Sequence, residues 1–182
     1  MSCEATNLRA YLRRGGLIAY PTESCYGLGC DPRNPHALKR LIRLKGRSAA
    51  KGLLLIADRF KRLRTFVRPL SAPDRARMQR SWPGPITWVV PASAACPPLL
   101  TGGRPTIAVR VTAHACAARL CRSLGMALVS TSANKSGKPP AKSAAECRRM
   151  FGAQVRVIDG RIGRRHRPST LIDLATGTVL RP

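Results

Sequence analysis

Aromatic and acidic residues are scarce in this chain. Phe, Trp and Tyr make up 4% of the 182 residues, and Asp and Glu together number only 8. Few aromatic rings leave little material for a surface on which nucleic-acid bases stack. The acids are also widely spaced, so the sequence offers no pair of carboxylates suited to general acid–base catalysis.

Several other signals are missing, and each absence excludes a class of protein. No apolar run approaches the roughly 20 residues that span a bilayer, and the N-terminus lacks the pattern of a signal peptide. We therefore expect a cytoplasmic protein without a membrane partner. The seven cysteines contain no C-x-x-C pair and the three histidines are scattered, so we expect reduced thiols and no metal site.

The common nucleotide-binding fingerprints are absent as well. The chain has no G-x-x-x-x-G-K-[ST] sequence, and Gly27-x-Gly29 lacks the third glycine of the dinucleotide motif. No Ser-His-Asp or Cys-His arrangement can be argued from residue order. Any nucleotide site must therefore be built in another way.

Positive charge, by contrast, is present in excess. Lys and Arg total 33, which gives a formal net charge of +25. Such a field attracts polyanions at a distance, so tRNA or double-stranded RNA is a candidate partner. The charges are scattered along the sequence, and an ordinary solvated surface is the alternative interpretation. The length and the apolar share of 44% suit one globular domain over residues 1–182.

Predicted strands and helices alternate along the chain, which is typical of the α/β class. Apolar runs predict strands at residues 17–20, 53–57, 86–90, 106–111, 127–130 and 155–158, and a hairpin formed by 170–174 and 178–181. Capping residues and helical periodicity predict helices at 4–14, 35–46, 58–66, 71–80 and 113–124, and one opening at Ser143. Residues 22–32 and 92–105 are expected to be loops. We expect a twisted mixed sheet flanked by helices, with antiparallel pieces late in the chain.

Three cations, Lys45, Arg47 and Lys51, lie close together at the end of a predicted helix. Their mutual repulsion would be relieved by a phosphate chain, which Arg can grip with two hydrogen bonds while Lys acts as a point charge. Surface helices also end in Lys and Arg for a simpler reason, because the helix dipole favours cations there. Spacing alone leaves both interpretations open.

Hydroxyl and amide side chains cluster where predicted strands end. Ser130, Ser132 and Asn134 follow one apolar strand, and Thr22 follows the first. Ligands of α/β sheets gather at the carboxyl ends of strands, so these residues are candidates for binding phosphate or ribose, with an ordinary turn as the alternative. Arg110 lies between two valines of a predicted buried strand and needs either a ligand carboxylate or an internal acid as its partner.

Several sequence blocks together resemble one known family. They include Lys45-Gly46-Arg47 and Ser132-Ala133-Asn134, and they fall in the family's order at residues 15–23, 26–31, 44–52, 82–87, 108–110 and 130–137. The chain resembles the YrdC/TsaC family of threonylcarbamoyl-AMP synthases, in its short single-domain form. The resemblance implies a YrdC-like α/β fold.

The resemblance also implies an activity and a set of site residues. The enzyme would make threonylcarbamoyl-AMP and pyrophosphate from L-threonine, bicarbonate and ATP, with Mg²⁺ sharing the phosphate charge. A downstream threonylcarbamoyl transferase complex would use the product to form N6-threonylcarbamoyladenosine in tRNA. Lys45 and Arg47 would be catalytic, and Thr22, Arg110 and Ser130 would bind threonine. The residues expected to bind ATP are Lys45, Arg47, Lys51, Thr87, Ser132, Asn134 and Ser169.

Two other functions are compatible with parts of the sequence. A non-catalytic RNA-binding or ribosome-associated module would explain the charge, but it gives no reason for Thr22, Ser132 and Asn134 at strand ends. A carbamoyl-transfer domain of a larger maturation enzyme would be expected to carry zinc-finger cysteines, and the sequence has none.

Overall fold

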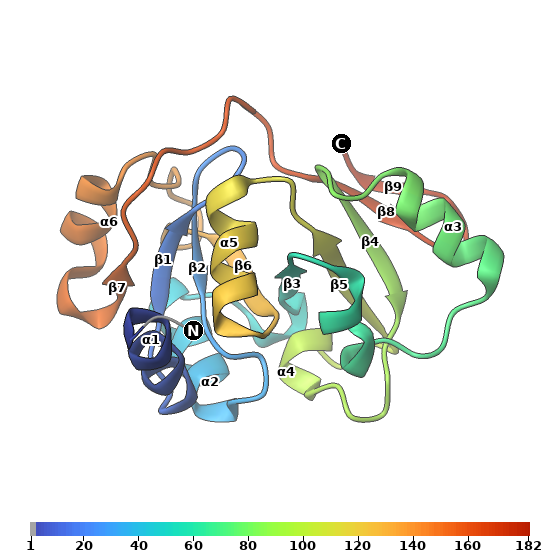
Figure 1. Cartoon of the computed structure of the whole chain (residues 1–182), viewed down its shortest axis with the longest axis horizontal. Helices are drawn as coiled ribbons and strands as arrows, with labels where there is room; N and C mark the ends of the chain where they lie inside the picture. The colour runs from blue at the N-terminus through green and yellow to red at the C-terminus, as the bar shows by residue number, and fades with distance from the viewer. Residues whose placement is uncertain (1–2) are drawn as a thin grey trace.

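The computed structural model describes residues 3–182 and forms a mixed sheet flanked by helices (Figure 1). Met1 and Ser2, at the N-terminus where no signal peptide was expected, lie outside the described residues. The strands are β1 (Ile18–Pro21), β2 (Tyr26–Gly29), β3 (Leu54–Ala57), β4 (Ile86–Pro91), β5 (Thr106–Val111), β6 (Leu128–Ser132), β7 (Arg156–Val157), β8 (Thr170–Asp173) and β9 (Val179–Arg181). The helices are α1 (Cys3–Arg13), α2 (Pro35–Lys45), α3 (Ala72–Arg80), α4 (Pro98–Thr101), α5 (Ala115–Leu124) and α6 (Ala144–Phe151), with 3-10 turns η1 (Ala49–Lys51), η2 (Phe60–Arg62), η3 (Arg64–Phe66) and η4 (Gly152–Gln154).

The strands form one sheet in the spatial order β7-β1-β2-β6-β3-β5-β4-β8-β9. The pairs β1–β7, β3–β5 and β4–β8 are parallel, and the other neighbours are antiparallel. The predicted α/β class with a mixed sheet is therefore confirmed. The antiparallel piece predicted late in the chain is confirmed by β8 and β9, and β1 and β2 add an antiparallel pair near the N-terminus that was not predicted.

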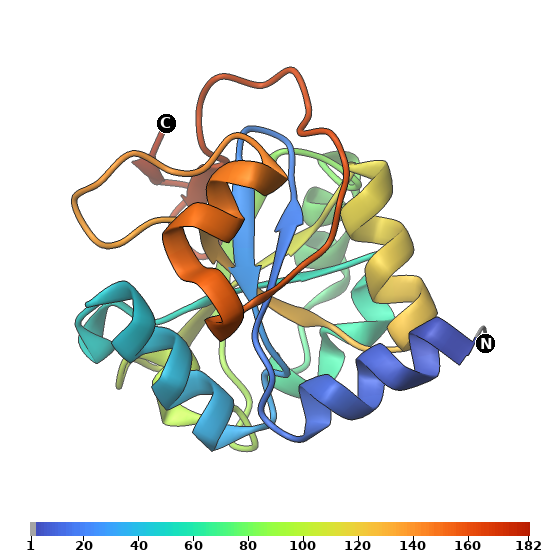
Figure 2. The ribbon, with the colours of Figure 1, turned by 90° about the vertical axis from the view of Figure 1, so that its left-hand side faces the viewer.

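Helices cover both faces of the sheet (Figure 2). On one face α1 and α5 pack through Leu12 and Leu124 into a cluster that includes Ile18. On the other, α2 and α6 contribute Leu38 and Phe151 to a larger core cluster. Because alternate residues of a strand face opposite sides, neighbouring residues of one strand enter different clusters. No helix within residues 3–182 is long and apolar enough to cross a membrane.

The strand β2 corrects the prediction of a continuous loop over residues 22–32. It lies between β1 and β6, and Gly27 and Gly29 are part of it. A Cβ atom on Gly29 would come within 2.5 Å of the Val129 carbonyl oxygen and 2.7 Å of the Tyr20 ring. Glycine is present here because strands and side chains approach closely, and not because the chain forms a loop at this point.

Two further predictions about local structure need correction. Residues 58–66 form the 3-10 turns η2 and η3 and not an α-helix, since the Asp58 carboxylate makes ion pairs with Arg59 and Arg62 and does not cap a helix. The short helix α4 interrupts the predicted loop at 92–105. The predicted helix at 71–80 and the C-terminal hairpin are confirmed, and the cysteines from Cys25 onward are free thiols as expected.

Candidate active site

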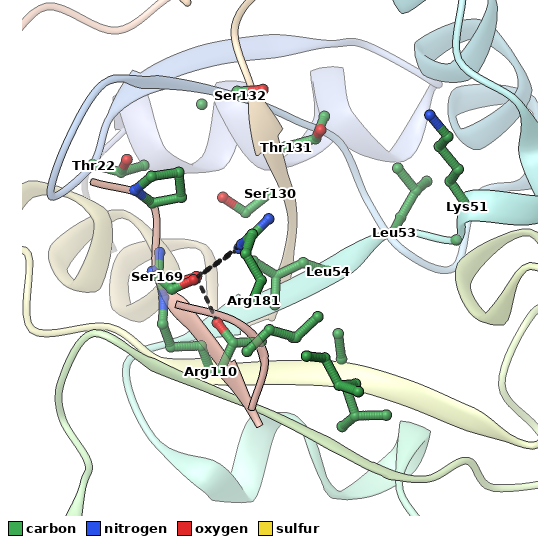
Figure 3. Close-up of a pocket in the computed structure, with 18 of the residues that line it drawn as sticks. Thr22, Lys51, Leu53, Leu54, Arg110, Ser130, Thr131, Ser132, Ser169 and Arg181 are labelled. Atoms are coloured by element: carbon green, nitrogen blue, oxygen red, sulfur yellow. Dashed lines mark hydrogen bonds between the residues drawn. The ribbon is translucent and has the colours of Figure 1, made fainter. Parts of the chain in front are cut away.

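A pocket of about 780 Å³ opens where the ends of several central strands meet (Figure 3). Most of the predicted site residues line it: Thr22, Arg47, Lys51, Thr87, Arg110, Ser130, Ser132 and Ser169. They come from segments that are far apart in the sequence, and the order of strands in the sheet brings them together. Ser130 and Ser132 belong to β6 itself and do not follow it, which corrects the predicted strand end at residue 130.

Lys45 does not lie on the pocket wall, although it was predicted to bind phosphate there. Only 2% of Lys45 is exposed, so the alternative of a solvated helix end is wrong for this residue. Its Nζ donates to the backbone oxygen of Ser132, to the backbone oxygen of Asn134 at 2.9 Å and to the Asn134 Oδ1 at 2.8 Å. Three acceptors use the three hydrogens of the ammonium group. Burial, followed by the charge of Arg47, lowers the pKa of Lys45 to about 8.

Asn134 is likewise absent from the pocket wall. Its Oδ1 accepts hydrogen bonds from Lys45 and, at 2.7 Å, from the Ser132 hydroxyl. Its amide nitrogen donates to the backbone oxygen of Lys138. Asn134 therefore orders the loop after β6, and Ser132 is the member of this group that reaches the pocket.

Basic side chains outnumber carboxylates on the pocket wall. The Lys and Arg residues there are Arg47, Lys51, Arg104, Arg110, Lys142, Arg167 and Arg181, whereas the acids are Glu23 and Asp173. Burial, and after it the charges of Arg181 and Arg104, lowers the pKa of Arg47. Burial and then Arg110 lower the pKa of Arg181. These cations repel one another, and a ligand with several anionic oxygens would relieve that repulsion.

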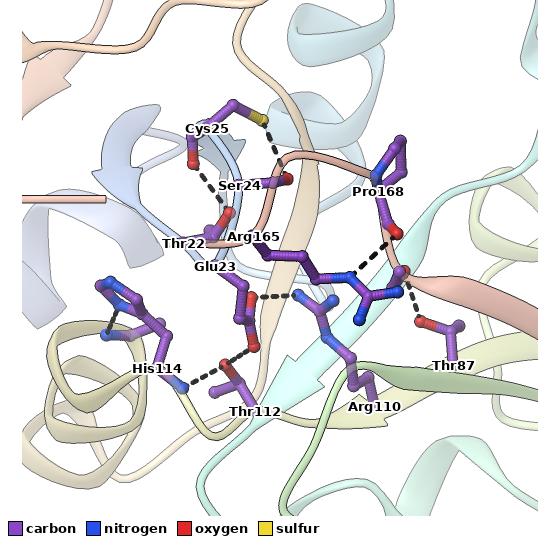
Figure 4. Close-up of polar contacts among 12 residues, drawn as sticks. Thr22, Glu23, Ser24, Cys25, Thr87, Arg110, Thr112, His114, Arg165 and Pro168 are labelled. Atoms are coloured by element: carbon purple, nitrogen blue, oxygen red, sulfur yellow. Dashed lines mark hydrogen bonds and ion pairs between the residues drawn. The ribbon is translucent and has the colours of Figure 1, made fainter. Parts of the chain in front are cut away.

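Arg110 has an internal acid as its partner (Figure 4). Its Nη2 donates to Glu23 Oε2 at 3.0 Å, and the Thr112 hydroxyl donates to Glu23 Oε1 at 2.6 Å. This resolves the choice that the sequence left open between an acid and a ligand. Arg110 nevertheless lines the pocket, and its buried Nε has no hydrogen-bond partner in the part of the chain that the structure describes.

Ser169 joins two strands at the pocket floor (Figure 3). Its hydroxyl accepts a hydrogen bond from Thr87 on β4 at 2.9 Å. Arg181 on β9 donates to the Ser169 backbone oxygen at 2.9 Å. Thr87 and Ser169 were predicted as site residues, but Arg181 was not.

Comparison with known proteins agrees with this geometry. The family model for Sua5/YciO/YrdC, described as telomere recombination, matches residues 10–182. The chain belongs to the Sua5/YciO/YrdC family. The predicted resemblance is therefore confirmed.

Three relatives of this Sua5/YciO/YrdC chain illustrate the similarity. A protein of Thiobacillus denitrificans named threonylcarbamoyl-AMP synthase is 78% identical over 174 residues, which cover 96% of this chain and 93% of that protein. The crystal structure of P. abyssi Sua5 complexed with L-threonine has a TM-score of 0.90 at 35% identity; the match covers 98% of this chain but only 54% of that one. The structure of E. coli YciO has a TM-score of 0.83 at 27% identity, covering 98% of this chain and 88% of YciO.

Four basic residues that line the pocket were not predicted from the sequence. They are Arg104, Lys142, Arg167 and Arg181. Nothing in the local sequence distinguishes them from the other arginines and lysines of a strongly basic chain. Arg181 reaches the pocket because β9 pairs with β8, and β8 with β4. A correct strand order would have been needed to find it.

Glu23 and Asp173 are the carboxylates of the pocket wall that could bind a metal ion. Glu23 already accepts hydrogen bonds at both carboxylate oxygens, and Asp173 Oδ1 accepts from two backbone N–H groups of the following turn. Within residues 3–182 no group of three His, Cys, Asp or Glu side chains could hold a metal ion. These donors form no all-protein cage for Mg²⁺, an ion that one or two carboxylates hold together with substrate phosphates.

Proposed function

We propose that this chain is a threonylcarbamoyl-AMP synthase, a nucleotidyltransferase that forms L-threonylcarbamoyladenylate and pyrophosphate from L-threonine, bicarbonate and ATP. The observation that carries the proposal is the pocket in which cations outnumber acids beside strand-end hydroxyls. The name of the 78% identical relative supports the same activity. The product would serve N6-threonylcarbamoyladenosine formation in tRNA through a downstream threonylcarbamoyl transferase complex.

The proposed chemistry has two steps. The deprotonated amine of threonine attacks the carbon of bicarbonate, water leaves, and an N-carboxylate (a carbamate) forms. A carbamate oxygen then attacks the α-phosphorus of ATP, the bond to the bridging oxygen of the β-phosphate breaks, and pyrophosphate leaves. The reacting groups are anions, so the pocket must align them and balance their charge. Mg²⁺ enters as the counter-ion of ATP and is part of that substrate.

The site residues divide between the two larger substrates. Arg110, fixed by Glu23, and the hydroxyls of Thr22 and Ser130 lie together in one part of the pocket and suit the carboxylate and hydroxyl of threonine. Arg47 and Lys51 suit the phosphates of ATP, with Ser132, Thr87 and Ser169 as further polar contacts. Lys45 acts indirectly, because its ammonium holds the loop that carries Ser132 and Asn134.

The proposal extends to the setting of the enzyme. Residues 1–182 would act as one catalytic domain in the cytoplasm, and the formal charge of +25 would attract tRNA or double-stranded RNA through phosphates. RNA binding would accompany catalysis and would not replace it. The RNA backbone would bind at the protein surface, and that contact gives no role to the hydroxyls inside the pocket.

A reaction of the purified protein with ATP, Mg²⁺, L-threonine and bicarbonate tests the proposal. Mass spectrometry should detect the threonylcarbamoyl adenylate, and pyrophosphate release should require both threonine and bicarbonate but no RNA. Formation of ADP and phosphate, or turnover that does not depend on threonine, would refute the assignment. Sequence-selective RNA binding without any adenylate would favour the RNA-binding module.

A further inference from the structure

Among the arginines on the pocket wall that the sequence did not predict, Arg104 stands beside the proposed phosphate site. Arg104 lies in the loop between α4 and β5, more than fifty positions along the chain from Arg47 and Lys51. It is exposed and lines the pocket. Its side chain makes no hydrogen bond or ion pair with any residue in the range 3–182, so its guanidinium donors are free for a ligand.

The backbone holds the Arg104 loop against the segment that carries Lys51. The Leu53 N–H donates to the Leu100 carbonyl oxygen at 2.8 Å. At Gly52, with a φ of 61°, a Cβ atom would lie 2.7 Å from that same oxygen and 3.2 Å from Arg104 Nη2. At Gly102, with a φ of 65°, it would lie 2.4 Å from the Ala50 carbonyl oxygen. Two glycines thus allow the two segments to touch, which places Arg104 beside Gly52.

Arg47 completes a cluster of three cations at this point. Its guanidinium donates to the Gly52 carbonyl oxygen at 3.2 Å and 3.3 Å, so Arg47 and Arg104 both lie next to Gly52. Neither Arg47, Lys51 nor Arg104 forms an ion pair with an acid in the described part of the chain. In Figure 3, Lys51 lies away from Thr22, Ser130 and Arg110, the residues assigned to threonine.

We propose that Arg104 binds the β- and γ-phosphates of ATP, together with Arg47 and Lys51, and holds pyrophosphate as it leaves. The inference rests on the proposed function for the identity of the ligand. The α-phosphorus must approach the threonine carbamate, so the more highly charged phosphates extend toward the cations at the far side. Three cations without a carboxylate partner match the part of ATP that carries the most negative charge.

Direct binding measurements test this role without relying on turnover. The wild-type protein, Arg104→Gln and Arg104→Lys are titrated calorimetrically with ATP, pyrophosphate and AMP. Arg75→Gln is the matched control, because Arg75 is exposed on α3, lies outside the pocket wall and gives the same change in net charge. Arg104→Gln should weaken pyrophosphate and ATP binding by about tenfold or more and leave AMP binding unchanged. Arg104→Lys should recover part of the loss, and Arg75→Gln should match the wild type.

The outcomes separate this inference from the proposed function. If Arg104→Gln binds pyrophosphate as tightly as the wild type does, the proposed role of Arg104 is overturned, even if the wild type makes the adenylate. An equal loss for AMP and pyrophosphate, or an equal loss in Arg75→Gln, would mean a general field effect and would also overturn it. Arg104-dependent pyrophosphate binding in a protein that forms no adenylate would refute the proposed reaction and keep the phosphate site.

Discussion

Replacing Lys45 by methionine should destabilise the fold, because Lys45 acts as a buried anchor for the loop after β6. The ammonium group donates to three oxygens on Ser132 and Asn134, and 2% of the residue is exposed. Methionine keeps the length of the side chain but removes three charge-assisted hydrogen bonds. The Ser132 backbone oxygen keeps the Asn134 N–H and Asn134 Oδ1 keeps the Ser132 hydroxyl, whereas the Asn134 backbone oxygen has no other donor among the described residues. Each lost hydrogen bond to a charged group costs about 1.5–3 kcal/mol.

An opposing term reduces this cost. The pKa of Lys45 falls from 10.5 to about 8, so burying the charged form costs about 3 kcal/mol that methionine avoids. The balance is a net loss of about 1.5–6 kcal/mol in the free energy of unfolding. For a chain of this size, that loss lowers Tm by about 3–24 °C.

Thermal unfolding of Lys45→Met beside Lys51→Met provides the measurement. Lys51 is exposed on the pocket wall and its side chain has no hydrogen bond within the described residues, so Lys51→Met should keep the wild-type Tm while raising the KM for ATP. An unchanged Tm in Lys45→Met, together with lost activity, would contradict the anchor role and restore the original prediction of direct phosphate contact.

The dependence of stability on pH gives a second test of the same residue. The folded pKa lies below the unfolded one, so between about pH 8 and 10.5 the unfolded chain binds more protons than the folded chain. The cost of burying the ammonium is present in full below pH 8 and disappears as pH rises to 10.5. Urea denaturation should therefore show wild type gaining stability relative to Lys45→Met over this window, by up to about 3 kcal/mol. A constant difference would mean that the pKa is not lowered.

Three other expectations follow from the structure. Arg110→Ala should raise the KM for threonine far more than that for ATP, and it should lower stability by about 1–3 kcal/mol because the half-buried Glu23 keeps only the Thr112 hydroxyl as a partner; equal changes in both KM values would remove Arg110 from threonine binding. Gly29→Ala should lower the urea midpoint, since the added Cβ would collide with β6, at a cost of about 1–3 kcal/mol; an unchanged midpoint would mean that the strands can separate freely. Duplex RNA should bind with little sequence preference, and the logarithm of its binding constant should fall with the logarithm of the salt concentration with a slope of about −0.9 per phosphate contacted. Filter binding across a salt series measures this slope, and a weak salt dependence with strong sequence preference would mean that base contacts dominate.

Local signals in the sequence predicted the elements whose structure is decided locally. Asn34 caps α2 through a hydrogen bond from the Ala37 N–H, and Pro35 occupies the first turn, as the sequence suggested. The strand β2 was missed because the sequence does not show whether a glycine serves a turn or a close approach. That distinction depends on Val129 and Tyr20, which become neighbours of Gly29 only when the sheet has formed.

Pocket residues could be predicted where the sequence placed them at the end of a strand, and could not where their position depends on long-range pairing. Thr22, Ser130 and Ser132 were candidates because their hydroxyls lie at or next to predicted strand ends, with an ordinary turn as the alternative. Arg104 and Arg181 could not, since the chain holds 33 basic residues and only long-range pairing brings these two to the pocket. The charge that suggested an anionic ligand also concealed which arginines line the pocket.

The turn at Gly46 explains why two neighbouring cations of one motif have different tasks. Gly46 ends α2 in the left-handed region, with φ 57° and ψ 40°, and its N–H donates to the Arg43 carbonyl oxygen while the Arg47 N–H donates to that of Ile42. This cap ends the helix at Gly46. Lys45, still on the helix, points to the loop after β6, whereas Arg47 leaves the helix and reaches the pocket. The motif thus joins a buried anchor to a cation that lines the pocket, and its spacing alone cannot show which is which.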